Sequence, residues 1–326
     1  MSIEILKANA QVTIQDAGRW KYQSSGVPVS GPIDDDAFRK ANLLVGNRLH
    51  DACIEMGTGY LELKVSSNTL LAFTGFGHTA FLDHIKIPTY QSIFINQEAL
   101  LKLKPSSLGL WSYLAFNGGA NIPTVLNSKS TYLPSGFGGL NGRVLKKGDT
   151  ILPNENQSEV SQRMIRSLSG SYYRAKWFLL AQHNVKDVIR IMPGPEWNWL
   201  TKHQQEKLLT QPFFISTDSN RMGYRLTGAP ILREANTEMI SSGVMKGTIQ
   251  LANNGNLIVL MADSQTVGGY PRIAQVAAVD VPILAQRKPG AEVRFSLISH
   301  EESEQLFLDR AADYRKIETG IRLKYL

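Results

Sequence analysis

The chain repeats one pattern in its two halves: Asp218-Ser-Asn-Arg-Met-Gly-Tyr-Arg-Leu-Thr-Gly-Ala-Pro230 is matched by Asp16-Ala-Gly-Arg-Trp-Lys-Tyr-Gln-Ser-Ser-Gly-Val-Pro28. Both stretches place an Asp, an Arg, a Tyr, a Gly and a Pro at the same relative positions. Because Gly and Pro recur in turns of unrelated proteins, a chance match is the alternative interpretation. The simplest interpretation is an ancient duplication of one β-rich unit.

The similarity continues downstream of both copies. Gly57-Thr58 in the first half corresponds to Gly247-Thr248 in the second, and an apolar run at 68–73 corresponds to one at 256–261. The polar stretch 153–162 lies between the halves and has few apolar side chains to bury, which is typical of a linker or surface excursion. The sequence therefore predicts two domains, residues 1–160 and residues 161–326.

Short apolar runs separated by Gly, Pro and Asn dominate the chain and have the spacing of β-strands. These runs are 69–73, 92–95, 110–116, 188–191, 257–261 and 293–297. Three helices are predicted from acidic first turns, capping residues and apolar spacing. They are 33–44, 196–209 and a last helix opened by the capping box Ser299-x-x-Glu302. The predicted class is mainly β, with two related barrel-like units and a few peripheral helices.

Length and composition indicate a globular protein without covalent staples. The 326 residues include 43% hydrophobic and 19% charged residues, which is enough for a core in each of two domains. The single Cys53 excludes an internal disulfide and a zinc site built from several thiolates. Glu4 and Lys7 interrupt the N-terminal apolar residues, so no signal peptide is predicted, and the cytoplasm is the expected location.

The net charge of +7 arises from 35 Lys and Arg against 28 Asp and Glu. These charges are scattered along the chain, with no Lys/Arg-rich run and no aromatic-basic module, so nucleic-acid binding is not predicted. An anionic ligand or an acidic partner subunit is favoured instead. No apolar run is long enough for a membrane span, and no membrane partner is expected.

Neither a nucleotide loop nor a metal site is predicted. Gly75-x-Gly77 and Gly136-Phe-Gly-Gly139 lack the strand-loop-helix context of a phosphate loop, so both are predicted to be turns. His78, Asp83 and His84 could meet in a hairpin, but a solvated turn is the favoured interpretation because a metal site needs more ligands.

A polar and glycine-rich set of residues remains as the candidate site. The glycine pair lets backbone N–H groups approach a ligand, and an arginine offers a planar fork for a carboxylate or phosphate. An alternative stays open, in which Asp16–Arg19 and Asp218–Arg221 are structural ion pairs that brace a turn in each repeat. The set comprises Asp16, Arg19, Tyr22, Ser30, Ser130, Thr131, Arg143, Asp218, Arg221, Tyr224, Asp263, Gln265, Thr266, Gly268, Gly269 and Tyr270.

At these residues the chain resembles the family called allophanate hydrolase subunit 2, KipA, or carboxyltransferase subdomains A and B, which includes the C subunit of 5-oxoprolinase. The matching stretches run in family order over nearly the whole chain. They are Thr13-Ile-Gln-Asp-Ala-Gly-Arg19, Gly26-Val-Pro-Val-Ser-Gly31, Ala41-Asn-Leu-Leu-Val-Gly-Asn47, Ser130-Thr-Tyr-Leu133, Gly136-Phe-Gly-Gly139, Asp218-Ser-Asn-Arg-Met-Gly-Tyr-Arg-Leu226 and Gln265-Thr-Val-Gly-Gly-Tyr-Pro271.

The resemblance implies two cyclophilin-like, β-rich subdomains that work with a KipI-like subunit, which bears subdomains C and D. It further implies a 5-oxoprolinase complex with a LamB/YcsF-like third subunit, which opens 5-oxo-L-proline to L-glutamate with ATP. Two alternatives remain: one half of a biotin-dependent carboxyltransferase of the urea carboxylase type, and a KipA-type regulatory protein that antagonises a KipI-like kinase inhibitor. Since this chain shows no ATP site of its own, ATP is expected on or shared with a partner subunit.

Three departures from the family pattern concern residues near the candidate site. Ala17 replaces a usual Leu, Asn127-Ser-Lys129 replaces a common Gly-Ser-Arg, and Ser264 stands where Arg is frequent. Because two common arginines are replaced, by Lys129 and Ser264, the identity of an anionic substrate is put in question. The fold implied by the resemblance is unaffected.

The resemblance leads to a hypothesis for substrate binding and catalysis. Arg19, Arg221 and Tyr224 would orient a carboxylate-bearing or ureido substrate. Gln265 and the backbone of Gly268 and Gly269 would hydrogen-bond the reacting amide and stabilise a phosphorylated imidate. The remaining assignments are a general base, Asp218 or Asp263, and two further substrate-binding residues, Ser130 and Tyr270.

Overall fold

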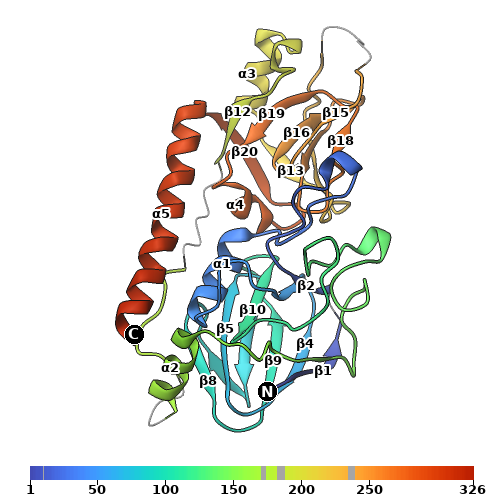
Figure 1. The fold of residues 1–326 in the computed structure, drawn as a ribbon. Coiled ribbons are helices and arrows are strands. Elements are labelled where there is room, and N and C mark those ends of the chain that lie inside the picture. Colours follow the sequence, from blue (N-terminus) through green and yellow to red (C-terminus); the bar gives the residue numbers. More distant parts are fainter. Residues whose placement is uncertain (10, 170–173, 182–187, 234–238) are drawn as a thin grey trace. The chain divides into compact units, whose positions relative to one another are not determined.

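The structure is a computed structural model that describes residues 1–9, 11–169, 174–181, 188–233 and 239–326 (Figure 1). The chain divides into two compact units, which we call unit 1 and unit 2. Unit 1 comprises Met1–Arg19, Ser30–His183 and Ala312–Leu326. Unit 2 comprises Trp20–Val29 and Asn184–Ala311.

Unit 1 contains two antiparallel sheets. The six-stranded sheet has the order β11 (Thr150–Ile151), β1 (Ile3–Ala8), β4 (Leu61–Val65), β9 (Ala99–Pro105), β6 (His78–Leu82) and β7 (Ile85–Ile87). The five-stranded sheet has the order β2 (Val12–Gln15), β3 (Cys53–Met56), β10 (Ser112–Phe116), β5 (Thr69–Gly75) and β8 (Ser92–Ile95).

The burial patterns show how these sheets form one core. Strands β4 and β9 begin with buried residues alternating with half-buried ones, as expected when only one face of a sheet packs inward. Strands β5 and β10 are buried at every residue because helix α1 (Asp35–Leu44) packs against them. One hydrophobic cluster, which includes Leu63 and Leu114, contains side chains from both sheets.

Unit 2 is built on a closed seven-stranded barrel. Its strand order is β12 (Val188–Pro193), β19 (Arg272–Val276), β16 (Thr248–Leu251), β17 (Leu257–Leu260), β14 (Gly223–Gly228), β13 (Phe213–Ile215) and β20 (Glu292–Leu297). Closure leaves no unpaired sheet edge in the barrel. A separate two-stranded ribbon pairs β15 (Ser242–Gly243) with β18 (Val267–Gly268).

Helices are short except for the last. Besides α1 they are α2 (Glu159–Leu168), α3 (Lys202–Thr210), α4 (Val281–Ala285) and α5 (His300–Tyr325), with 3-10 turns η1 (Gln23–Ser25), η2 (Leu133–Ser135) and η3 (Trp197–Trp199). The predicted capping box is confirmed, since Ser299 Oγ accepts from the Glu302 N–H and Glu302 Oε2 accepts from the Ser299 N–H. No helix in the described ranges is long and apolar enough to cross a bilayer.

The mainly β class and the six predicted strands are confirmed, although only unit 2 closes into a barrel. The two copies of the repeated pattern have different local structures. Residues 218–222 lie in the turn between β13 and β14, whereas residues 16–28 follow β2 as a loop that contains η1. The duplication therefore leaves no shared hairpin at these positions.

The two units do not divide at residue 160. Residues 159–168 form α2, in which Ser158 caps the first turn and Met164 is fully buried, so part of the predicted linker is a helix of unit 1. The following segment is tied to the edge strand β8, because the Ala175 N–H donates to the Ser92 carbonyl. Unit 1 thereby extends past the expected boundary, and residues 312–326 of α5 also belong to it.

The predicted turns are confirmed. Asp83 and His84 have φ values of 45° and 77° and connect β6 to β7, so they form a tight hairpin turn on the surface. Gly75, Gly138 and Gly139 all have positive φ, in the range that favours glycine.

His78 lies in the core of unit 1 as a neutral imidazole. Burial lowers its pKa to about 4, although the hydrogen bond between Nε2 and the Gly59 carbonyl, 2.9 Å long, acts in the opposite direction. Nδ1 lies 3.2 Å from Ser112 Oγ. Between the ordinary pKa of 6.5 and the folded-state value, the unfolded chain binds a proton that the folded protein does not, so stability falls as pH falls.

We predict that the buried His78 imidazole lowers the free energy of unfolding by about 2 kcal/mol when the pH falls from 7 to 5, because the imidazole takes up a proton only in the unfolded chain. Urea unfolding at a series of pH values measures it, with His78→Gln as the variant that removes the titration. The matched control is His84→Gln at the exposed turn, which should keep the wild-type slope. Parallel pH profiles for wild type and His78→Gln would contradict the assignment.

Candidate functional site

The first copy of the repeated pattern forms a buried junction in unit 1. Asp16 follows β2, and its carboxylate accepts hydrogen bonds from Ser128 Oγ and Ser130 Oγ, both at 2.6 Å, and from the backbone N–H groups of Lys129 and Gly18 at 2.6 and 2.9 Å. None of these four donors is Arg19. The expected Asp16–Arg19 ion pair is therefore replaced by a carboxylate that holds the loop 128–130.

Arg19 completes the same junction from a fully buried position. Its Nη2 donates to the Ser130 carbonyl at 2.5 Å, and its guanidinium lies 4.7 Å from the centre of the Phe137 ring. A Cβ on Gly138 would lie 2.0 Å from the Ser130 carbonyl oxygen, so this glycine is required by close packing. Arg19 and Ser130, both predicted to bind substrate, thus have structural partners inside unit 1.

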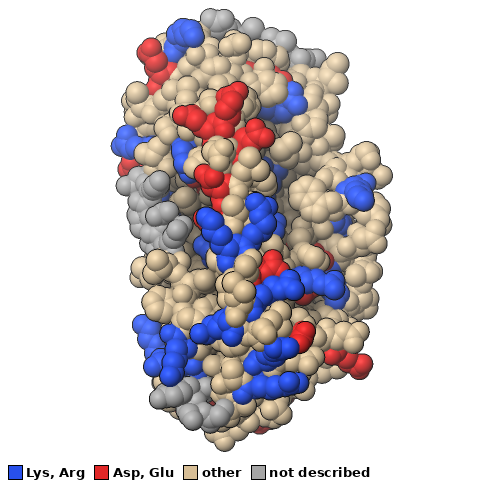
Figure 2. Space-filling view, turned by 60° about the vertical axis from the view of Figure 1, so that its left-hand side comes forward, with Lys and Arg blue, Asp and Glu red and all other residues tan. Residues whose placement is uncertain are grey.

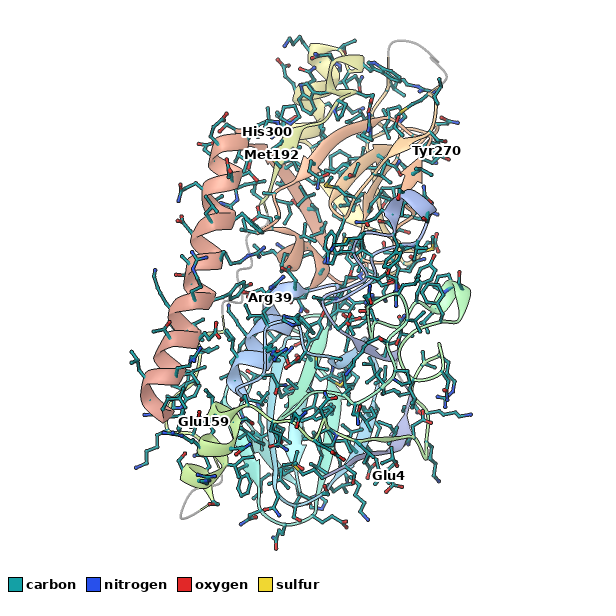
Figure 3. All side chains as sticks on the ribbon, viewed as in Figure 1. Glu4, Arg39, Glu159, Met192, Tyr270 and His300 are labelled. Carbon is teal, nitrogen blue, oxygen red and sulfur yellow. The ribbon has the colours of Figure 1, made fainter. Side chains whose placement is uncertain are left out.

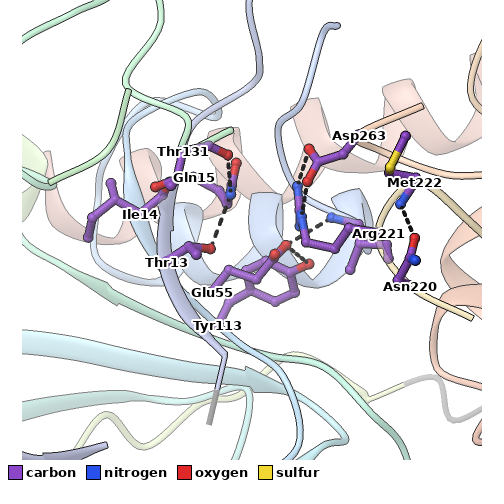
Figure 4. A network of polar contacts seen from close by, with 11 residues as sticks. Thr13, Ile14, Gln15, Glu55, Tyr113, Thr131, Asn220, Arg221, Met222 and Asp263 are labelled. Carbon is purple, nitrogen blue, oxygen red and sulfur yellow. Dashed lines mark hydrogen bonds and ion pairs between the residues drawn. The ribbon is translucent and has the colours of Figure 1, made fainter. Parts of the chain in front are cut away.

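The second arginine is paired with a distant carboxylate. Arg221 Nε and Nη2 donate to Asp263 Oδ2 and Oδ1 at 2.8 and 3.0 Å (Figure 4), and both residues are buried. Asp218, the partner expected from the repeat, is exposed, and among the described residues none bonds to its carboxylate. The geometry favours a bracing role for the pair. Substrate binding by Arg221 and catalysis by Asp263 or Asp218 stay predictions.

Tyr224 lies on β14 and is buried with 2% of its surface exposed. Its hydroxyl donates to the Ala285 carbonyl at 2.8 Å, which ties the barrel strand to α4. The hydroxyl therefore has a protein partner, as the two arginines do.

The remaining predicted residues lie together on an accessible face of unit 2. Gln265, Gly269 and Tyr270 are exposed, and Gly268 between them is buried in the ribbon strand β18. Tyr270, labelled in Figure 3, lies two residues after the end of this strand. These four residues border the barrel strand β16, because an added Cβ on Gly268 would lie 2.4 Å from Gln250 Nε2 on that strand. We call this region the ribbon face.

Sequence reasoning missed the polar residues of β16 and β19 that lie beneath the ribbon. Thr248 Oγ1 donates to Gln275 Oε1 at 2.9 Å, and Gln275 Nε2 donates to the Lys246 carbonyl at 3.0 Å. Gln250 is 1% exposed, and its Nε2 donates to the Tyr270 carbonyl at 3.4 Å. The signal in the sequence was the alternation of polar Thr248 and Gln250 with apolar residues in a buried strand.

An ion pair between Glu196 and Arg272 fixes one end of the ribbon face. Arg272 Nη2 and Nε donate to the two Glu196 carboxylate oxygens at 2.8 and 3.0 Å, and Nη1 donates to the Gly243 carbonyl of β15 at 3.0 Å. Burial alone would raise the pKa of Glu196, but the hydrogen bonds from the Arg272 side chain and backbone outweigh it and hold that pKa below its ordinary value. The carboxylate thus stays ionised and bound to Arg272.

The ribbon face therefore offers neutral hydrogen-bonding groups to a ligand. Its charged pair is internally satisfied, and its glutamine amides can both donate and accept. Among the described residues, no group of three His, Cys, Asp or Glu side chains is placed to hold a metal ion. A neutral polar ligand, such as an amide, matches this chemistry.

A polar cavity of about 620 Å³ lies elsewhere, in unit 1, and contains none of the predicted site residues. The amide nitrogen of Asn154 in its wall donates to the Gly118 carbonyl, and Asn47 Oδ1 accepts from the Gly118 N–H. These amides thus stabilise the loop around Gly118.

The comparisons with known proteins agree over most of the chain. The sequence profile of the family described as "Carboxyltransferase domain, subdomain A and B" matches residues 25–297. The C subunit of the 5-oxoprolinase of Escherichia coli (strain K12) is 37% identical over 303 residues, which cover 92% of this chain and 93% of that protein. The urea amidolyase of Lachancea kluyveri is 28% identical over 337 residues, covering 98% of this chain but 18% of that protein.

A solved structure has the same fold. The crystal structure of the K. lactis urea amidolyase superposes with a TM-score of 0.84 at 23% sequence identity, covering 97% of this chain and 20% of that chain. This chain thus corresponds to a minor part of the much longer urea amidolyases.

We predict that Arg221→Ala lowers the free energy of unfolding by about 3 to 5 kcal/mol, because it leaves the Asp263 carboxylate buried without its guanidinium. Urea unfolding followed by circular dichroism measures the loss. The control is Arg221→Met combined with Asp263→Leu, which removes both charges and should recover most of the stability. If Arg221→Ala unfolds like wild type, the pair does not brace the barrel.

Proposed function

The chain belongs to the family of carboxyltransferase domains, subdomains A and B, and we propose that it acts as the C subunit of a 5-oxoprolinase. In this proposal the assembled enzyme opens the lactam ring of 5-oxo-L-proline to give L-glutamate, with ATP hydrolysis as the driving reaction. The observation that carries the proposal is the 37% identity to the C subunit of a 5-oxoprolinase over 92% of this chain and 93% of that protein.

The chemistry of the ribbon face supports a lactam substrate. A lactam carries one N–H donor and one carbonyl acceptor, and the amides of Gln250 and Gln265 provide the complementary groups. In the proposal these residues bind and orient the ring.

ATP is proposed to bind a partner subunit, because the glycine-rich loops of this chain do not fit phosphates. An added Cβ on Gly77 would lie 2.4 Å from the Leu110 carbonyl oxygen, and one on Gly139 would lie 1.9 Å from Thr131 Oγ1. Both loops thus pack against the chain's own atoms, whereas a phosphate loop directs its N–H groups to a ligand.

The proposed partners are a KipI-like subunit and a LamB/YcsF-like subunit. Unit 1 offers a basic surface for an acidic partner, made of α2, residues 174–181 and the part of α5 in unit 1. These segments carry eight Lys and Arg against three Asp and Glu, and they adjoin where Trp177 Nε1 donates to Tyr325 Oη and Arg163 Nη1 to the Leu326 carbonyl. Figure 2 shows Lys and Arg gathered in neighbouring groups on one face. Such a surface accelerates association with an acidic protein.

A second candidate function is the half of a biotin-dependent carboxyltransferase. The similarity to urea amidolyase over 98% of this chain favours it. Urea shares the amide group of 5-oxo-L-proline, so the hydrogen-bonding groups of the ribbon face are suited to either substrate. The two functions differ in whether turnover needs a biotinylated protein and bicarbonate.

We predict that the chain, co-expressed with its KipI-like and LamB/YcsF-like subunits, forms a complex that releases glutamate from 5-oxo-L-proline when ATP is supplied. The isolated chain should release none, because the glycine-rich loops at 75–77 and 136–139 pack against the chain's own atoms and do not suit phosphates. Glutamate formation and size-exclusion chromatography measure both expectations, with ATP omitted as the control.

Two results would contradict this proposal. Glutamate release by the purified chain alone would show that this chain carries out the whole reaction without partner subunits. Turnover of urea that requires biotinylated protein and bicarbonate, with none of 5-oxo-L-proline, would establish the second candidate instead.

A further inference from the structure

One buried polar group on the ribbon face has a hydrogen-bonding atom that the protein does not use. Gln250 is 1% exposed, and its Nε2 donates to the Tyr270 carbonyl. In the described part of the chain, however, no group donates to its Oε1. Oε1 is not one of the fully buried side-chain atoms that lack a partner in the described residues, so water or a ligand can reach it.

Gly268 lies in close contact with this amide. An added Cβ would lie 2.4 Å from Gln250 Nε2 and 3.3 Å from Gln265 Nε2, so the ends of two glutamine side chains approach the same backbone atom. Gly268 is not among the residues with positive φ, so backbone conformation does not demand a glycine here. The requirement is room for the two amides.

We propose that Gln250 and Gln265 form a recognition site for the amide group of a lactam or a urea, on the outer side of the unit 2 barrel next to Gly268. The ligand N–H donates to Gln250 Oε1, and the ligand carbonyl accepts from Gln265 Nε2. In a lactam the N–H and the carbonyl lie on the same edge of the ring, so two side chains at one place can bind both. The choice of 5-oxo-L-proline as ligand rests on the proposed function.

The surroundings favour the amide group and the apolar ring of a lactam. Arg272 and Glu196 are bonded to each other, so the electrostatic partner of each is already supplied. Val267, Met245 and Tyr270 beside the amide pair are 54%, 65% and 38% exposed. Their apolar atoms can pack on the methylene groups of a lactam ring. The site thus binds the amide group and the ring, so the lactam 2-pyrrolidinone, which has no carboxylate, should also bind.

The first test compares two alanine substitutions in the same ribbon. Gly268→Ala places a methyl group against Gln250 and Gln265, whereas Gly243→Ala on the paired strand meets no atom within 4 Å. In the assembled complex, Gly268→Ala should raise KM for 5-oxo-L-proline by about tenfold or more, and Gly243→Ala should leave it near wild type. Melting temperatures of both variants check that the barrel is folded. Equal KM values for the two folded variants would overturn the proposal.

The second test addresses the ligand N–H directly. N-methyl-5-oxo-L-proline lacks this hydrogen, so it should inhibit the wild-type complex at least about tenfold more weakly than 5-oxo-L-proline binds. Gln250→Met, which keeps the side-chain volume but removes the acceptor, should abolish most of that discrimination. Gln250→Met that still discriminates as wild type does would show that another group binds the N–H.

A third measurement separates this proposal from the proposed function. If the wild-type complex releases no glutamate, the proposed function fails, and binding of 2-pyrrolidinone to the complex still reports on the site. Saturation-transfer NMR should then detect 2-pyrrolidinone on wild type and on Gly243→Ala but not on Gly268→Ala. No binding to wild type, or equal binding to both variants, would overturn the amide site itself.

Discussion

A buried guanidinium must be paired, and this constraint decides which residues of the protein hold its structure. Arg19 is fully buried between the Ser130 carbonyl and the Phe137 ring, and Arg221 is buried against the Asp263 carboxylate. Each arginine joins segments that are far apart in sequence, the first in unit 1 and the second in unit 2. Removing either member of the Arg221–Asp263 pair would leave a desolvated charge, which is among the most destabilising changes in a folded protein. The contacts of Arg19 and Arg221 therefore stabilise the folded protein.

In our proposal, ligand recognition depends on neutral groups of the ribbon face, where Arg272 and Glu196 are bonded to each other. Amides suit this task because one side chain offers both a donor and an acceptor, and because a mismatch leaves a polar group unpaired. The buried strand β16 fixes Gln250, and the ribbon strand β18 brings Gly268 against it. In the proposed site, the barrel strand thus fixes the position of Gln250, and the short ribbon keeps Gln265 accessible to a ligand.

The sequence predicted what depends on local pattern and missed what depends on long-range pairing. The strands 92–95 and 257–261 and the Ser299–Glu302 capping box follow from apolar runs and short-range hydrogen bonds, and they are confirmed. The partner of Arg221 could not be read from the repeat, because Asp263 lies 42 residues away and is brought near by the barrel. Gln250 was overlooked because a polar residue inside an apolar strand becomes meaningful only when the covering ribbon is known. Helix α2 was missed because its first turn lies within a stretch of polar composition typical of linkers.

The central claim, that this family member binds an amide substrate at the ribbon face, is tested most directly by a crystal structure of the assembled complex with 5-oxo-L-proline and no ATP. The account predicts the lactam ring beside Gly268, with its N–H on Gln250 Oε1 and its carbonyl on Gln265 Nε2. Arg221 should remain paired with Asp263 in that structure. A lactam whose carboxylate is bound by Arg221, with Asp263 displaced and the ribbon face empty, would contradict the account.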